Sequence, residues 1–258
     1  MLIAQISDLH VTLPGQLAYG IFDTAGNLSG CLAQIMQANP VPDVVLATGD
    51  LVETGAPDEY RRLRELLAPL TMPLYLIPGN HDDRAALCAA FRDHAYLPRE
   101  GEPLRYAVED FEVRLIALDT MIPGADGGTL DDAQLDWFDA TLSAAPGRPT
   151  LVLMHHPPFK TGIRCMDEIA LDAASACRLG AIVERHRHVE RIVCGHVHRG
   201  IQARWRGTAV SVCPSTAFQY ILDLRENGFN SSTREPPAYQ AHFWNGAELV
   251  THTIAVTR

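Results

Sequence analysis

The chain has 258 residues, of which 47% are hydrophobic and 20% charged, so its length and composition predict a folded globular core. The formal net charge of −10 argues against the basic footprint of a nucleic-acid-binding surface, and we expect no nucleic-acid polymer as a partner. Six cysteines without a Cys-x-x-Cys pair favour reduced thiols in a cytoplasmic protein. The first apolar run is too short for a signal peptide, and no run approaches the ~18 apolar residues of a membrane span, so we expect no membrane association.

Strand-like and helix-like segments alternate through the first part of the chain, and the rest is richer in strands. Short apolar runs predict strands at 2–7, 44–48, 74–77, 104–108, 113–118, 150–154 and 189–193. Helical spacing and capping signals predict helices at 28–36, 57–67, 83–92, 131–142 and 173–187. Hairpins are expected at 201–213 and 239–256, with a loop-rich excursion at 216–237 between them. This order predicts an α/β fold whose sheet, or pair of stacked sheets, is covered by helices.

Polar clusters follow five of the predicted strands. They are Asp8-Leu9-His10, Gly49-Asp50, Gly79-Asn80-His81-Asp82, His155-His156 and Gly195-His196-Val197-His198. Strand ends are where open α/β sheets keep their chemistry. Each cluster alone is more typical of a helix cap, a turn or a structural histidine. All five together, each at the end of a strand, are hard to explain by chance.

The clusters offer carboxylate, amide and imidazole ligands for metal ions. The spacing of Asp8 and His10, and of His196 and His198, places alternate side chains on one side of an extended chain, so both can reach one centre. A carboxylate such as Asp50 has two oxygens and can bridge two cations. A mixed nitrogen and oxygen set suits Mn, Fe, Co or Zn better than Ca or Mg. Two metal ions with open positions are a known device for in-line displacement at phosphorus.

As a set, these clusters resemble the motifs of the calcineurin-like metallophosphoesterases, from residue 2 to about residue 213. The contexts 80–83, 19–23 and 154–158 are most similar to the bacterial class III cyclic-nucleotide phosphodiesterases and glycerophosphodiesterases. The resemblance implies a four-layer αββα sandwich. It also implies a catalytic core at 1–213 and a C-terminal excursion and closing hairpin at 214–258, expected to act as a cap or dimer contact.

The resemblance implies a role for each residue of the clusters. One metal ion would be held by Asp8, His10, Asp50 and His198, and the other by Asp50, Asn80, His155 and His196. The cofactors would be two divalent or transition metal ions, with Fe and Mn favoured. Catalytic roles are expected for Asp50, for His81 facing the phosphate, and for Asp82 orienting His81, while His156 would lie behind the ligands.

Substrate contacts are expected from Asn80, His81 and the loop residues Tyr19 and Phe22. The alternative for the two aromatic residues is ordinary packing. The excursion at 216–237 is a second candidate wall, and Phe218 stands where related diesterases carry a histidine.

Two residues differ from the patterns of other branches of this family and argue against membership of those branches. Glu53 stands where purple acid phosphatases have a tyrosine ligand, and Asp82 where protein phosphatases have a glutamate. No Lys or Arg lies within the clusters, which weakly favours diesters over monoesters.

The predicted reaction is hydrolysis of a small phosphodiester such as a cyclic nucleotide or glycerophosphodiester. Two cations would lower the pKa of a bound water, and His81 would stabilise or protonate the reacting ester. A phosphomonoesterase, a nuclease or a non-catalytic scaffold on the same fold are the alternatives. We expect a homodimer or higher homo-oligomer, because similar proteins use a C-terminal extension for this contact.

Overall fold

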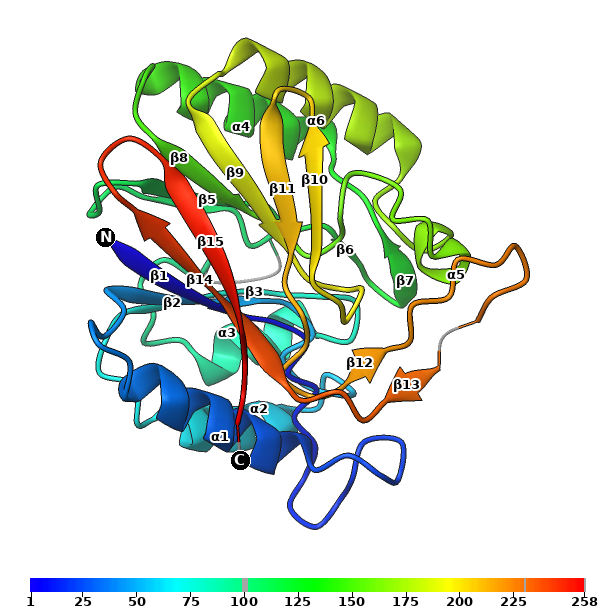
Figure 1. The fold of residues 1–258 in the computed structure, drawn as a ribbon. Coiled ribbons are helices and arrows are strands. Elements are labelled where there is room, and N and C mark those ends of the chain that lie inside the picture. Colours follow the sequence, from blue (N-terminus) through cyan, green and yellow to red (C-terminus); the bar gives the residue numbers. More distant parts are fainter. Residues whose placement is uncertain (99–101, 230, 258) are drawn as a thin grey trace.

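The computed structural model describes residues 1–98, 102–229 and 231–257, in which two β-sheets pack face to face between two layers of helices (Figure 1). Sheet I has the strand order β15 (Leu249–Ala255), β14 (Ala238–Trp244), β1 (Leu2–Ile6), β2 (Val44–Thr48) and β3 (Leu74–Ile77). Sheet II has the order β10 (Ile201–Trp205), β11 (Thr208–Val212), β9 (Val189–Cys194), β8 (Thr150–Leu153), β5 (Arg114–Ala117) and β4 (Tyr106–Val108).

Each sheet has its own helical layer (Figure 1). Sheet I is covered by α1 (Thr24–Met36), α2 (Pro57–Leu67) and α3 (Arg84–Ala90), and sheet II by α4 (Asp132–Ala144) and α6 (Ala173–Arg185). A third apolar core, which includes Ile3, Leu46, Leu115 and Leu151, lies between the sheets because the strands are buried on both faces. The predicted αββα sandwich is therefore confirmed.

Four of the helices begin at aspartate caps. Asp23, Asp83, Asp131 and Asp172 accept backbone N–H bonds in the first turns of α1, α3, α4 and α6. The helix expected at 28–36 therefore begins earlier, at Thr24.

Short elements that the sequence pattern did not predict connect the layers. They are the hairpin β6 (Met121–Ile122) and β7 (Ala125–Gly128), the one-turn helix α5 (Arg164–Asp167), and the pair β12 (Gln219–Tyr220) and β13 (Ser232–Thr233) within the excursion. The closing hairpin belongs to sheet I, since β14 pairs antiparallel with β1. Within the described ranges, no helix is both long and apolar enough to span a membrane.

The strand directions bring five polar turns to one edge of the sandwich. Strands β1, β2 and β3 are parallel in sheet I, and β8 and β9 are parallel in sheet II. A buried polar network joins the sheets near that edge, where Gln5 donates to the Cys194 carbonyl oxygen at 3.0 Å. The polar turns of sheet I and those of sheet II are thus held relative to each other by the core between the sheets.

Candidate metal centre

The turns after β1, β2, β3, β8 and β9 bring all seven predicted ligands together. The six carboxylate and imidazole residues are each 3% exposed or less, and they are Asp8, His10, Asp50, His155, His196 and His198. Asn80 is half-buried at the rim. Charged and ionisable groups are rarely buried so densely without a partner that compensates their loss of water.

The first half of the centre contains Asp8, His10, Asp50 and His198, whose ligand atoms lie within 4.8 Å of one another. His10 Nε2 is 3.1 Å from His198 Nε2 and 3.6 Å from Asp50 Oδ2. The other ring nitrogens face oxygens that only accept: His10 Nδ1 is 2.8 Å from Glu53 Oε2, and His198 Nδ1 is 3.0 Å from the Phe218 carbonyl oxygen. Both Nδ1 atoms therefore donate, and in neutral rings both Nε2 lone pairs face each other.

The second half contains Asp50, Asn80, His155 and His196. His155 Nδ1 donates to the Thr48 carbonyl oxygen at 2.8 Å, so Nε2 is the ring nitrogen left for a metal ion, and it lies 3.4 Å from Asp50 Oδ2 and 3.2 Å from Asn80 Oδ1. His196 Nδ1 lies 3.0 Å from the same Asn80 oxygen. Asp50 Oδ2 thus lies between an imidazole of each half, which is the position a bridging ligand requires.

These contacts fit divalent cations in both halves. Facing lone pairs and carboxylates repel one another unless a proton or a metal cation lies among them. Asp8 Oδ2 and His196 Nε2 are buried and find no hydrogen-bond partner among the described residues, which leaves both atoms available for a further interaction. The mixed nitrogen and oxygen donors suit transition metals and Zn better than Ca or Mg.

The charges of the metal-free cluster are strongly coupled. Burial raises the pKa of Asp8 to about 6 despite the nearby His155. Burial also acts to raise the pKa of Asp50, but the facing His155 and other histidines hold it well below its usual range. The same pairing outweighs burial at His155 and raises its pKa to about 9. Asp50 is thus kept ionised, as a bridging carboxylate must be.

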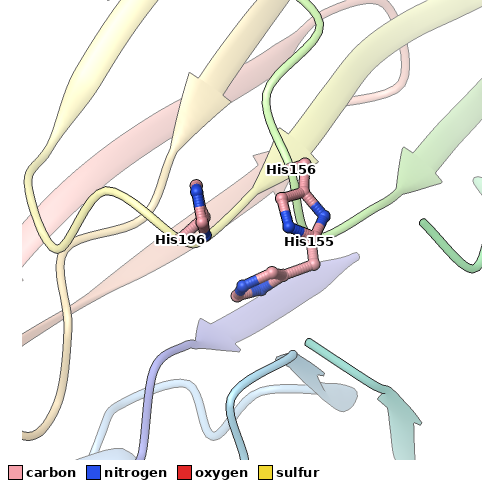
Figure 2. Close-up of side chains that lie close together, drawn as sticks. All are labelled: His155, His156 and His196. Carbon is pink, nitrogen blue, oxygen red and sulfur yellow. The ribbon is translucent and has the colours of Figure 1, made fainter. Parts of the chain in front are cut away.

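His156 packs behind the second half without a free nitrogen. Its ring lies with those of His155 and His196 at the ends of β8 and β9 (Figure 2). His156 Nε2 donates to the Asp126 carbonyl oxygen at 3.0 Å, so in the neutral ring Nδ1 accepts from the Thr120 hydroxyl at 2.7 Å. The backbone N–H of His156 donates to the same Thr120 oxygen at 3.3 Å. Because both ring nitrogens are engaged, this side chain supports the ligand rings from behind.

His81 lies at the rim and is oriented by Glu53. Its backbone N–H donates to Asp50 Oδ1 at 2.9 Å, and its Nδ1 donates to the Glu53 carbonyl oxygen at 2.8 Å. The expectation that Asp82 orients this ring is wrong, because the Asp82 carboxylate is engaged elsewhere. It accepts from Tyr60 Oη at 2.8 Å and from the backbone N–H groups of Gly79 and Leu51 at 2.8 and 3.1 Å. Asp82 therefore joins the turns after β2 and β3.

The backbone of the site is strained. Positive φ angles of 44–73° occur at five of its non-glycine residues, namely Asp8, His10, Asp50, His196 and His198. Such conformations cost roughly 1–3 kcal/mol each and concentrate at functional sites. Gly49 has φ +91°, and a Cβ there would collide with His155 Nδ1. Close turns of this kind are what allow the ligands to converge.

Aromatic residues form one wall beside the first half. Phe218 is 1% exposed and packs on His198 with 4.5 Å between ring centroids. Phe22 stacks on Phe218 at 4.8 Å, and Tyr19, which is 60% exposed, meets it edge-on at 5.3 Å. The loop before α1 and the start of the excursion therefore meet next to the ligands, with Tyr19 open to solvent.

Comparison with known proteins places this arrangement in a family. The family model described as calcineurin-like phosphoesterase matches residues 1–200. The chain belongs to the calcineurin-like phosphoesterase family. It is 38% identical to a glycerophosphodiester phosphodiesterase, GpdQ, of Enterobacter lignolyticus over 99% of this chain and 92% of the relative. It is 30% identical to the 3',5'-cyclic adenosine monophosphate phosphodiesterase CpdA of Escherichia coli K12, over 84% of this chain and 77% of that one.

The fold of this calcineurin-like phosphoesterase also matches solved structures. A dimetal phosphatase from Danio rerio superposes with a TM-score of 0.68 at 14% identity, covering 99% of both chains. At this identity the likeness shows the fold alone. The sequence resemblance to the bacterial diesterase branch is confirmed by the named relatives, and the buried His/Asp cluster fits the divalent metal ions expected of the family.

Proposed function

We propose that this phosphoesterase hydrolyses small phosphodiesters, with one divalent metal ion held by Asp8, His10, Asp50 and His198 and a second by Asp50, Asn80, His155 and His196. The observation that carries the proposal is the place of Asp50 Oδ2, which lies 3.6 Å from His10 Nε2 and 3.4 Å from His155 Nε2. When bound, two metal ions would supply a water of lowered pKa and polarise the phosphoryl oxygens.

The chain's own residues would orient the ester and move a proton. Because His81 Nδ1 donates to the Glu53 carbonyl oxygen, Nε2 is the ring nitrogen available to substrate. Protonated there, His81 could stabilise charge on phosphorus oxygens or donate to the leaving alkoxide. Its backbone N–H donates to Asp50 Oδ1, which holds the His81 backbone beside the carboxylate that would bridge the two ions. Asn80 lies beside it at the half-buried rim.

The charge around the site supports a diester substrate. The nearest flanking arginines are already paired: Arg84 binds Asp119 through two nitrogens at 2.6 and 3.0 Å, and Arg199 binds the Tyr220 carbonyl oxygen. A monoester carries about one more negative charge at neutral pH, and sites for it usually add a free Arg or Lys. The named relatives act on glycerophosphodiesters and a cyclic nucleotide, and we propose the same substrate classes here.

A panel assay tests the function directly. Protein loaded with Mn would be offered bis(p-nitrophenyl) phosphate, p-nitrophenyl phosphate, 3',5'-cyclic AMP, glycerophosphodiesters and DNA. We expect hydrolysis of small diesters well above that of the monoester and DNA. The variant His81→Ala should lose about 10²–10³ in kcat with its metal content unchanged, because one transition-state contact is worth that much. No turnover of any diester, or wild-type turnover by His81→Ala, would overturn the proposal.

We further propose the identity of the metal ions, the cellular location of the protein and its oligomeric state. Mn or Fe fits the mixed nitrogen and oxygen ligand set. A cytoplasmic location is supported by the spacing of the six cysteines, which form no Cys-x-x-Cys pair and match no disulfide framework. A homodimer through the excursion is supported by its exposed apolar side chains Leu222, Leu224 and Phe229. Replacing 221–231 with a short turn should halve the mass measured by light scattering, and an unchanged mass would contradict this contact.

A further inference from the structure

Glu53 lies directly behind the metal centre, on the turn that follows Asp50. Its side chain is 21% exposed, and its Oε2 is 2.8 Å from His10 Nδ1. Its carbonyl oxygen is 2.8 Å from His81 Nδ1. The His10 and His81 rings meet edge-on, with 4.6 Å between their centroids. One residue therefore contacts a ligand of the first half through its side chain and the substrate-facing histidine through its backbone.

The side chain of Glu53 differs from the groups behind the other Nε2 ligands. His155 and His198 donate their Nδ1 protons to neutral carbonyl oxygens, of Thr48 and Phe218. His10 donates to a carboxylate. A carboxylate fixes the same tautomer as a carbonyl but adds a negative charge, which makes the opposite ring nitrogen a stronger donor to a cation.

The loop that carries Glu53 is held without its side chain. The backbone N–H of Glu53 donates to the Val11 carbonyl oxygen at 3.2 Å. Further along, Glu59 Oε2 accepts from Thr54 N at 2.9 Å and from Ala56 N at 3.2 Å. A substitution at position 53 should therefore change the group behind His10 while the carbonyl that orients His81 stays in place.

We propose that Glu53 is a positioning residue that strengthens metal binding in the half of the centre containing His10, and that it leaves the half containing His155 and His196 nearly unchanged. The proposal rests on the binuclear centre of the proposed function. Removing a group that supports a ligand in this way typically costs 10–100-fold in metal affinity. Glu53 would thus give the two metal positions different affinities.

The test is titration of the metal-free protein with Mn²⁺ by calorimetry, and with Co²⁺ by its absorption spectrum. Wild type should take up two ions. In Glu53→Gln the amide oxygen can still accept from His10 Nδ1, so only the charge is lost, and one binding step should weaken by about tenfold. In Glu53→Ala that step should weaken by up to about 100-fold. The other step should stay within about twofold of wild type in both variants.

Glu65→Gln is the matched control, because Glu65 is an exposed carboxylate of α2 paired with Arg62, and it removes the same charge away from the site. Its two binding steps should equal those of wild type. Equal weakening of both steps in Glu53→Gln, or no weakening in either Glu53 variant, would overturn the role of Glu53. Wild type that binds two ions but hydrolyses no diester would sink the proposed function alone and leave this inference standing.

Discussion

Replacing Tyr60 with Phe tests whether Asp82 is the anchor of the catalytic turns. Tyr60 is fully buried, its hydroxyl donates to Asp82 Oδ1 at 2.8 Å, and it accepts from Asp83 N at 2.8 Å. The substitution removes a hydrogen bond to a buried carboxylate, which is worth about 1.5–3 kcal/mol. For a chain of this size we expect the Tm to fall by roughly 3–12 °C. Metal-free protein should be used, so that ligand binding does not mask the change.

Tyr106→Phe provides the matched control. Tyr106 is also buried, and its hydroxyl donates at 2.8 Å to the neutral Leu76 carbonyl oxygen. Loss of a hydrogen bond between neutral groups costs about 0.5–1.5 kcal/mol, so this variant should lose roughly half as much stability or less. Differential scanning calorimetry and urea unfolding measure both variants. If Tyr60→Phe is no less stable than Tyr106→Phe, Asp82 does not anchor the turns through Tyr60.

Two further predictions concern the backbone and pH. Gly49→Ala should lose metal from the second half and unfold at lower temperature, because its Cβ meets His155 Nδ1. Gly147→Ala is the control, because Gly147 has a similar φ of +82° but an added Cβ would meet no described atom within 4 Å. This variant should lose only the backbone strain of about 1–2 kcal/mol and keep its metal. Equal metal content in the two variants would count against the collision at Gly49. Burial lowers the pKa of His242 to about 3 from its ordinary 6.5, so as pH falls below 6.5 the unfolded chain binds a proton that the folded chain does not. Stability should fall by up to about 1.4 kcal/mol per pH unit, and urea unfolding at pH 7 and pH 5 should show a smaller loss for His242→Gln; identical losses would exclude His242 as the cause.

The sequence predicted most of the fold because its signals are local. Strands such as 44–48 are continuous apolar runs bounded by turn residues, and helix 57–67 has proline and acidic residues in its first turn. The hairpin at 121–128 was missed because β7 is Ala-Asp-Gly-Gly, which carries no strand propensity. Glycine is required at position 128 by tertiary packing, since a Cβ there would collide with His156.

The ligand set was visible in the sequence, but the groups that hold it were not. Asp8 and His196 are 188 positions apart in the chain, yet the backbone N–H of His196 donates to Asp8 Oδ1 at 2.8 Å. Which acceptor a side chain finds at such separation depends on packing. For this reason Asp82 was assigned to its neighbour His81, whereas its partner Tyr60 comes from α2. Glu53 was noticed only as a departure from a family pattern, although its position three residues after Asp50 on the same turn was a usable signal.

The strain and the electrostatics of the site have one common explanation. Positive φ at Asp8, Asp50 and His198 and the facing Nε2 atoms of His10 and His198 all oppose folding of the metal-free chain. A chain selected for stability alone would relax both features with glycine or asparagine and with apolar side chains. They persist because the core between the sheets fixes all five turns independently of the cluster. The fold thus holds the ligands in the arrangement that a pair of cations would stabilise.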